Sequence, residues 1–149
     1  MKTKQLLFLF IVFILFLSCD KDNEMTGIHE MVYYDCGEPV QVIPSGEYTQ
    51  TITLVDKSGI VKDIFWGIKK VTVSVNGQET IIHNTFMDGL EIHMYKKELK
   101  GDFFLLKQEG SKLHVSIEAN HTEVERTIEI DIVTMGYPID NLMIIQSKN

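Results

Sequence analysis

The chain has 149 residues, 44% of them hydrophobic, which is enough for one domain with its own core. Its formal net charge is −7 at pH 7, and removal of a leader that carries Lys2 and Lys4 would make it more negative. Such an acidic chain offers no Lys/Arg stripe to a phosphate backbone, so we expect it to bind no nucleic acid.

The N-terminus has the form of an export signal. Lys2 and Lys4 precede an unbroken apolar run from Leu6 to Leu17. As a helix this run would span roughly 18 Å, well short of the ~30 Å hydrocarbon core of a bilayer. We therefore predict a signal peptide over residues 1–18 and not a membrane-spanning helix.

Ser18-Cys19 follows the apolar run directly, and the combination resembles the lipobox of bacterial lipoproteins. In that family the signal is cut before the cysteine, whose thiol and new amino group are then acylated. Phe16 stands where the family usually has Leu or Val. The resemblance implies lipidation of Cys19 and a membrane partner reached through this N-terminal lipid anchor. A plain secretory peptide, with Cys19 incidental, is the alternative.

Residues 19–30 are predicted to be an acidic, flexible tether, because they show no apolar period. The cluster Asp20-Lys21-Asp22-Asn23-Glu24 resembles the surface-export signal of Bacteroidetes lipoproteins. That resemblance implies a location on the outer membrane, with the protein facing the cell exterior. A tether that only keeps the domain solvated is compatible with the same residues.

Residues 31–149 are predicted to form a single domain built of strands. Cys36 is the only cysteine left once Cys19 is lipidated, so we expect no internal disulfide and a partly buried, unreactive thiol. Asn76-Gly77 is the strongest hairpin signal, since both residues tolerate the positive φ of a type I′ turn. Lys96 to Asp102 is predicted to be a charged turn. Strands are predicted at residues 40–44, 47–55, 63–75, 78–86, 90–94, 102–108, 112–119, 127–132 and 142–146.

Strict alternation in the runs 112–119 and 127–132 predicts one buried face in each strand, with Ile130 inside and Glu129 outside. The polar turn Asn120–Glu123 is predicted to join these runs as an antiparallel pair, to which 142–146 returns as a third strand. We predict an all-β fold, an immunoglobulin-like β-sandwich of about eight or nine strands. A lipocalin-like closed barrel is the alternative.

Roughly residues 40–147 resemble the Bacteroidetes-associated BACON domain. The resemblance rests on Pro44-Ser-Gly-Glu-Tyr-Thr-Gln-Thr-Ile-Thr, on Gly110-Ser-Lys-Leu-His-Val-Ser-Ile-Glu-Ala-Asn, on Glu125-Arg-Thr-Ile-Glu-Ile and on the closing Ile145-Gln146. It implies an immunoglobulin-like sandwich of a kind often joined to carbohydrate-active enzymes and proposed to bind glycans or glycoproteins. The chain departs from the family in a longer middle segment, Ile60 to Glu98, and in Phe103-Phe104 where a Trp is expected.

Sugar-binding modules present exposed aromatic planes beside amide and acid side chains. Tyr95 precedes the charged Lys96-Lys97-Glu98, and Tyr137 lies in Gly136-Tyr-Pro138, so both are candidate ligand-binding residues at turns. Trp66 lies among apolar neighbours and is expected in the core.

No pattern in the chain predicts catalysis. The five histidines lack the short spacing of metal ligands, so we expect no metal and no cofactor. There is no Gly-rich phosphate loop and no nucleophile elbow. Glu129 and Asp131 share a strand face, but the outer face of a strand is normally solvated. We therefore expect a protein that is not an enzyme.

The sequence thus predicts a cell-surface lipoprotein that acts as a glycan- or glycoprotein-binding or adhesion module. The alternative is a structural or accessory subunit that docks onto a larger outer-membrane assembly. Met143 and Ile145, on the face opposite Leu142 and Ile144, would serve that docking if they are exposed. An exposed aromatic cleft would favour binding of a glycan, and a flat apolar patch would favour docking of a surface protein.

Overall fold

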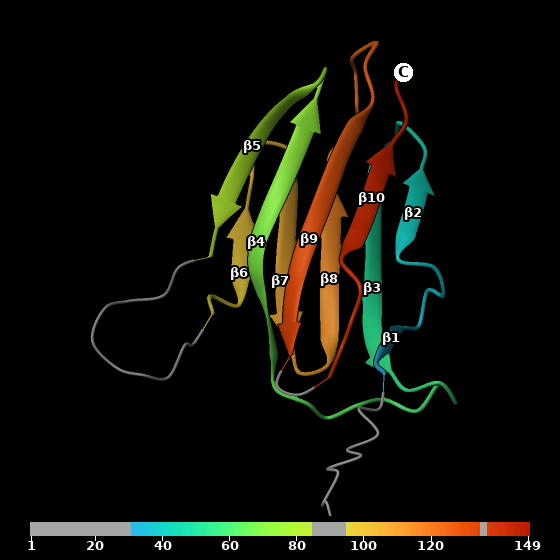
Figure 1. Cartoon of the computed structure of the whole chain (residues 1–149). Coiled ribbons are helices and arrows are strands. Elements are labelled where there is room, and N and C mark those ends of the chain that lie inside the picture. Colours follow the sequence, from blue (N-terminus) through green and yellow to red (C-terminus); the bar gives the residue numbers. More distant parts are fainter. Residues whose placement is uncertain (1–30, 85–94, 135–136) are drawn as a thin grey trace, which may run out of the picture.

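A computed structural model describes residues 31–84, 95–134 and 137–149, which form two five-stranded sheets packed face to face. In Figure 1 one sheet lies in front of the other, and the sheets do not close into a barrel. The strands of the described residues are β1 (Tyr33–Tyr34), β2 (Val40–Ile43), β3 (Tyr48–Val55), β4 (Trp66–Val75), β5 (Gln78–His83), β6 (Glu98–Lys100), β7 (Phe104–Glu109), β8 (Lys112–Ile117), β9 (Arg126–Thr134) and β10 (Leu142–Gln146).

The all-β sandwich is confirmed, and its strand order is immunoglobulin-like. One sheet runs β1-β3-β8-β7-β6, in which the first four strands correspond to A-B-E-D. The other runs β2-β10-β9-β4-β5, in which the last four correspond to G-F-C-C′. β2 lies parallel to β10 at the edge of this second sheet, while the other pairs of neighbouring strands in this sheet are antiparallel.

The core lies between the sheets and is built from the inward positions of alternating strands. Ile128, Ile130 and Ile132 of β9 are buried, and Ile130 is fully so, while the Glu129 between them keeps part of its surface in water. Leu142 and Ile144 continue the same buried face in β10. The predicted buried face of these strands is confirmed.

The hairpin predicted at Asn76-Gly77 is confirmed, and it joins β4 to β5. Both residues have positive φ, 53° for Asn76 and 74° for Gly77, which is the type I′ geometry. Val75 and Gln78 face each other across this two-residue turn. The twist of such a turn matches that of the strands, so the pairing continues to Lys70 and His83.

The pairing predicted for the turn Asn120–Glu123 is wrong. β8 pairs with β3 and β7, whereas β9 pairs with β4 and β10, so this turn crosses from one sheet to the other. Buried Asn120 holds the crossing, since its Nδ2 donates to the carbonyls of Val124 at 2.7 Å and Ser147 at 3.0 Å. Alternation shows which face of a strand is buried and does not show which strand lies beside it.

The segment from Tyr95 to Gln108 also differs from the prediction. Residues predicted as a charged turn include β6, and the predicted strand at 102–108 begins only at Phe104. A tight turn separates β6 from β7, with the Gly101 N–H donating to the Phe104 carbonyl at 3.0 Å. β1 was not predicted. The predicted signal peptide, the tether, Cys19 and the predicted strand at 90–94 lie outside the described residues.

Candidate functional site

The two candidate tyrosines lie at the end of the sandwich where β4 begins. Tyr95 is half-buried, and a Cβ added to Gly67 would lie 2.5 Å from its ring, so the ring rests directly on the backbone of β4. Tyr137 is also half-buried and packs against the core, and its carbonyl accepts a hydrogen bond from Thr134 Oγ1. Because Gly67 pairs with Val133 in the adjacent strand, both tyrosines belong to the same end of the sheet.

Trp66 is buried with 3% of its surface exposed, so its predicted place in the core is confirmed. Its Nε1 donates to the carbonyl of Gly110, in the β7–β8 turn of the opposite sheet, at 2.7 Å, and its own carbonyl accepts from Gln108 Nε2 at 2.7 Å. These two bonds tie the sheets together beside the indole.

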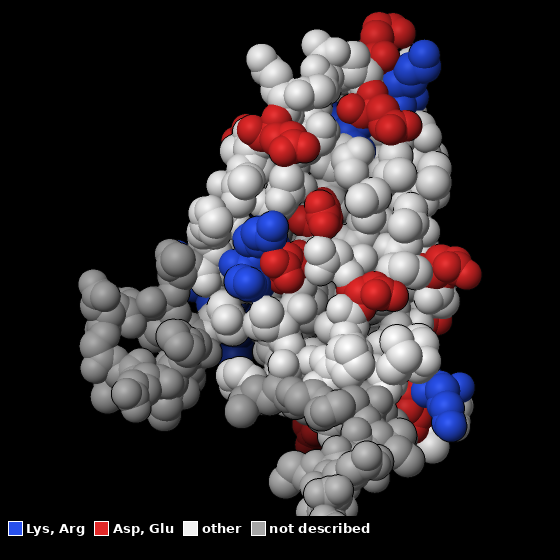
Figure 2. Space-filling view, viewed as in Figure 1, with Lys and Arg blue, Asp and Glu red and all other residues white. Residues whose placement is uncertain are grey.

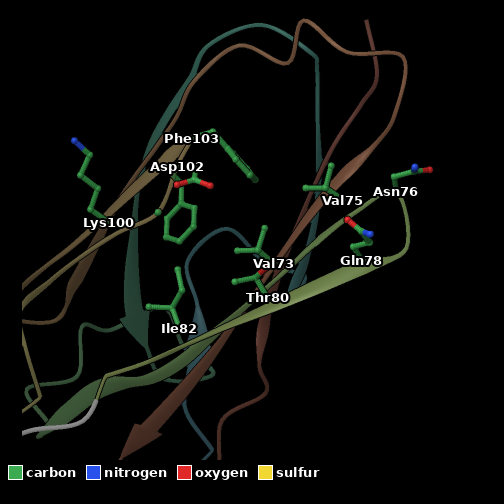
Figure 3. Close-up of a pocket in the computed structure, with 11 residues that line it drawn as sticks. Val73, Val75, Asn76, Gln78, Thr80, Ile82, Lys100, Asp102 and Phe103 are labelled. Atoms are coloured by element: carbon green, nitrogen blue, oxygen red, sulfur yellow. The ribbon is translucent and has the colours of Figure 1, made fainter.

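A cleft of about 780 Å³ opens at the other end of β4, between the β4–β5 hairpin and the β6–β7 turn (Figure 3). Five of its lining residues come from the β6–β7 side and six from the hairpin side. They are Val73, Val75, Asn76, Gln78, Thr80 and Ile82 on the hairpin side, and Lys100, Gly101, Asp102, Phe103 and Phe104 on the other.

The cleft exists because the inward face of β5 is not apolar throughout. Gln78, Thr80 and Ile82 pair with Val75, Val73 and Val71, so their side chains continue the core-facing side of β4. Val71 and Val73 are buried, but Gln78 and Thr80 are exposed. Polar side chains at these inward positions leave the sheets unsealed at this edge.

Phe103 provides an aromatic surface in the cleft. Figure 3 shows its ring reaching from the β6–β7 turn toward the hairpin, with the Asp102 carboxylate beside it and Lys100 pointing away. The ring is held by the Arg126 guanidinium, 4.5 Å from its centroid, and by an edge-on contact with Phe104 at 5.9 Å. No sequence pattern predicted this cleft, although the Phe103-Phe104 pair beside Asp102 was its signal in the sequence.

The cleft can hold a ligand with mixed polarity. Its wall of Val73, Val75 and Phe103 suits apolar surface, and Asp102 supplies a carboxylate acceptor. The amides of Asn76 and Gln78 add both donors and acceptors at the hairpin end. No described group within it is a nucleophile paired with a base.

A second surface feature lies on the outer face of the front sheet. Val40 and Val42 of β2 are 48% and 72% exposed, and they pair with Met143 and Ile145 of β10, which are half-buried. These four side chains form an apolar patch, which we call the β2–β10 patch. Over the rest of this face, acidic and basic residues are interspersed (Figure 2).

A row of polar side chains on the outer face of the back sheet was also not predicted from the sequence. Thr51 Oγ1 lies 2.9 Å from His114 Nδ1, and His114 Nε2 lies 3.2 Å from Glu109 Oε2. An acid, an imidazole and a hydroxyl in this order resemble a hydrolase relay. Thr51 and His114 are opposite partners on β3 and β8, and we interpret the row as a cross-strand contact that stabilises the sheet.

Cys36 is half-buried, and its Sγ lies 3.8 Å from the Glu38 carbonyl. Burial, together with the charge of Asp35, raises the pKa of this thiol and so favours the protonated, less nucleophilic form.

Within the described parts of the chain, no group of three or more His, Cys, Asp or Glu side chains is arranged to hold a metal ion. No helix among the described residues is long and apolar enough to cross a bilayer.

Fold and surface together define the class of this protein: an immunoglobulin-like β-sandwich with an open inter-sheet cleft at one end. The chain is similar to a protein from Bacteroides thetaiotaomicron whose structure was determined by NMR. The TM-score is 0.53 at 19% sequence identity, over 74% of this chain and 77% of that chain. At this identity the similarity shows a shared fold alone.

No family model and no curated protein matches this sequence. The resemblance to the BACON family therefore stays a prediction.

Proposed function

We propose that this chain is a cell-surface lipoprotein whose β-sandwich binds a glycan or glycoprotein in the cleft at the β4–β5 hairpin. The observation that carries the proposal is the lining of that cleft. Phe103 offers an aromatic surface with the Asp102 carboxylate beside it, and Gln78 offers an amide from the hairpin side.

The chemistry of a sugar suits such a lining. The C–H faces of a pyranose pack on an aromatic plane, and its hydroxyls require donors and acceptors at fixed positions. Ligand sites in proteins usually enclose ~300–1,000 Å³, and the cleft falls inside this range. The BACON resemblance, whose family is proposed to bind glycans, is consistent with the same reading.

The position of the cleft also supports a surface-anchored module. Tyr33 pairs with Val55 at one end of β3, whereas Tyr48, at the other end, pairs with Ile117, which faces Phe104 of the cleft lining. Eight strand residues separate these ends by about 25 Å. A lipid anchor at Cys19 and a tether over 19–30 would hold the domain by its β1 end and turn the cleft outward (Figure 1).

Tyr95 and Tyr137 form the competing site for the same function. Both lie near the end at which the described chain enters the domain, since the Val32 N–H donates to the Pro138 carbonyl at 3.3 Å. That end would face the membrane in the proposed arrangement. For this reason we place the glycan in the cleft.

A glycan array probed with the full chain in detergent would test the site. We expect Asp102→Ala and Gln78→Ala, both at exposed positions, to abolish a detected signal, and Tyr95→Ala and Tyr137→Ala to retain it. Glu98→Ala, exposed on the adjacent β6, is the matched control. Loss of signal in the tyrosine variants alone would move the site to the other end, and an array without any signal from folded protein would reject glycan binding.

The anchor is tested separately by Cys19→Ala. No other residue in the lipobox has a thiol that can receive the lipid. The variant should therefore not take up label from a radioactive or alkyne-tagged fatty acid. Label that persists in this variant would reject the lipoprotein proposal while leaving the cleft untouched.

A second function, that of an accessory subunit, is favoured by the β2–β10 patch. Val42 is exposed beside Ile145, and contact of these apolar side chains with water is unfavourable. A surface protein that covered them would remove this contact. A photo-crosslinking residue placed at position 42 should then yield one discrete adduct in cells, and the same residue at Thr49, on the opposite sheet, should not. An equal pattern at both positions would exclude docking through this patch.

A further inference from the structure

β5 is the outermost strand of the front sheet, and the described residues place no strand beyond it (Figure 1). All of its residues except Ile82 are exposed, and Ile81 has half of its surface in contact with water. An edge strand of this length with an exposed branched residue is a template for pairing with another strand.

The hairpin determines which backbone groups of β5 are directed outward. Val75 and Gln78 flank a two-residue type I′ turn, and in such a turn the flanking residues form a hydrogen-bonded pair. Gln78, Thr80 and Ile82 therefore direct their N–H and C=O groups toward β4. The backbone groups of Glu79, Ile81 and His83 point away from the sheet.

A second copy of β5 fits this edge in a register centred on Ile81. A two-fold axis through Ile81, perpendicular to the sheet, sets Ile81 opposite the partner's Ile81 and Glu79 opposite the partner's His83. The outward backbone groups of these three residues then meet as hydrogen-bonded pairs. Side chains that face each other also lie on the same side of the sheet, as an antiparallel pair requires.

The polar side chains of β5 select this register, because Glu79 lies opposite the partner's His83 only when the pair is centred on Ile81. Centring the pair on Thr80 or Ile82 would set Ile81 opposite the partner's Glu79 or the partner's His83, and centring it on Glu79 would set two carboxylates opposite each other. Like charges directly opposite each other destabilise a strand pair. The register centred on Ile81 gives instead two acid–imidazole contacts that flank an apolar contact, and it uses the full length of β5.

We propose that two copies of this chain associate through antiparallel β5–β5 pairing, which joins their front sheets into one ten-stranded sheet. The two-fold axis keeps both core-facing sides on the same side of this sheet. The clefts, which include Gln78, Thr80 and Ile82 of β5, then flank the interface. Two clefts held this close would raise the avidity for a repeating ligand. The pairing itself does not depend on what the clefts bind.

Cysteine cross-linking of the full chain in intact cells would test the pairing. Ile81→Cys places a thiol on the two-fold axis, so a short bismaleimide should convert most of this variant into a covalent dimer. Thr49→Cys, exposed on β3 of the other sheet, is the control and should stay monomeric. Equal dimer yields for the two variants would overturn the proposal.

Charge swaps added to Ile81→Cys test the register. Glu79→Lys should lower the yield of the covalent dimer, because it removes the carboxylate that contacts the partner's His83. The double change Glu79→Lys with His83→Glu restores opposite charges across the axis and should recover the dimer. Recovery distinguishes the pairing from simple damage to β5, and an unchanged dimer yield after the single change would reject this register.

A backbone test needs no cysteine. Ile81→Pro, studied by chemical cross-linking of lysines, removes an N–H that points away from β4 and should prevent β5–β5 pairing. The β4–β5 hairpin should stay intact in this variant. Protease treatment of intact cells would show this, because the variant should be as resistant as the wild type. A folded Ile81→Pro variant that still forms the wild-type amount of dimer would exclude the edge of β5 as the interface.

Discussion

The space between the two sheets differs at the two ends of β4. At the start of β4 it is filled by Trp66, and at the end of β4 it opens as the cleft. The Trp66 side chain donates to Gly110 of the opposite sheet, so its size and its one polar atom are both accommodated. At the cleft the inward positions of β5 are held by Gln78 and Thr80, which are exposed. One pair of sheets thus has a sealed end, built for stability, and an open end, available to a ligand.

The largest effect on this comparison is expected from Trp66→Ala. Removal of a buried indole that bridges the sheets should lower the free energy of unfolding by about 3–5 kcal/mol. Trp66→Phe is the milder control, which keeps most of the apolar volume but leaves the Gly110 carbonyl without its donor. Urea unfolding followed by circular dichroism measures both, and a Trp66→Ala variant as stable as the wild type would show that this end is not sealed by packing.

Between the two ends, Ile130→Asp tests the shared core. Ile130 is fully buried opposite Val71, so a carboxylate there should cost roughly 3 kcal/mol or more. Glu129→Gln, the neighbouring outward position, should change stability by less than ~0.5 kcal/mol, and it keeps an oxygen for the Asn141 amide. Equal effects of the two substitutions in urea unfolding would contradict the assigned faces.

A glycine at each end extends the comparison to smaller effects. A Cβ at Gly101 would overlap the ring of buried Phe104, and a Cβ at Gly67 would press on the ring of half-buried Tyr95. We expect each Gly→Ala change to cost about 1–3 kcal/mol, with Gly101→Ala the more harmful because Phe104 has less room to move. Thermal unfolding would rank them, and the reverse order would mean that the Tyr95 ring is the more tightly held.

The smallest change in stability is expected from Thr80→Val in the cleft. Thr80 is exposed, so this isosteric change should alter the free energy of unfolding by less than ~0.5 kcal/mol while it removes a hydroxyl from the cleft wall. Under the proposed function, retention of a glycan should weaken. A large loss of stability would show instead that Thr80 contributes to the core, and the contrast between the ends would fail.

Features that depend on neighbouring residues were predictable. The alternation around Ile130 defined a buried face, and Asn76-Gly77 defined the hairpin, because strand pleating and a positive φ are decided within a few residues. The burial of Trp66 followed from its apolar surroundings. The lipobox at Cys19 and the BACON resemblance rest on sequence patterns that this fold does not test.

Features that depend on distant residues were not predictable from the sequence. The turn Asn120–Glu123 crosses between sheets because β8 and β9 find better partners elsewhere, and nothing in either strand names those partners. The cleft forms only where β5 and the β6–β7 turn meet at one edge of the sandwich, although the turn lies some twenty residues further along the chain. By itself the sequence determined most of the longer strands, their buried faces and the hairpin, because pleat and turn geometry are local. Only the tertiary structure decided which strands are neighbours and where the sandwich stays open, because side-chain packing between distant segments selects both.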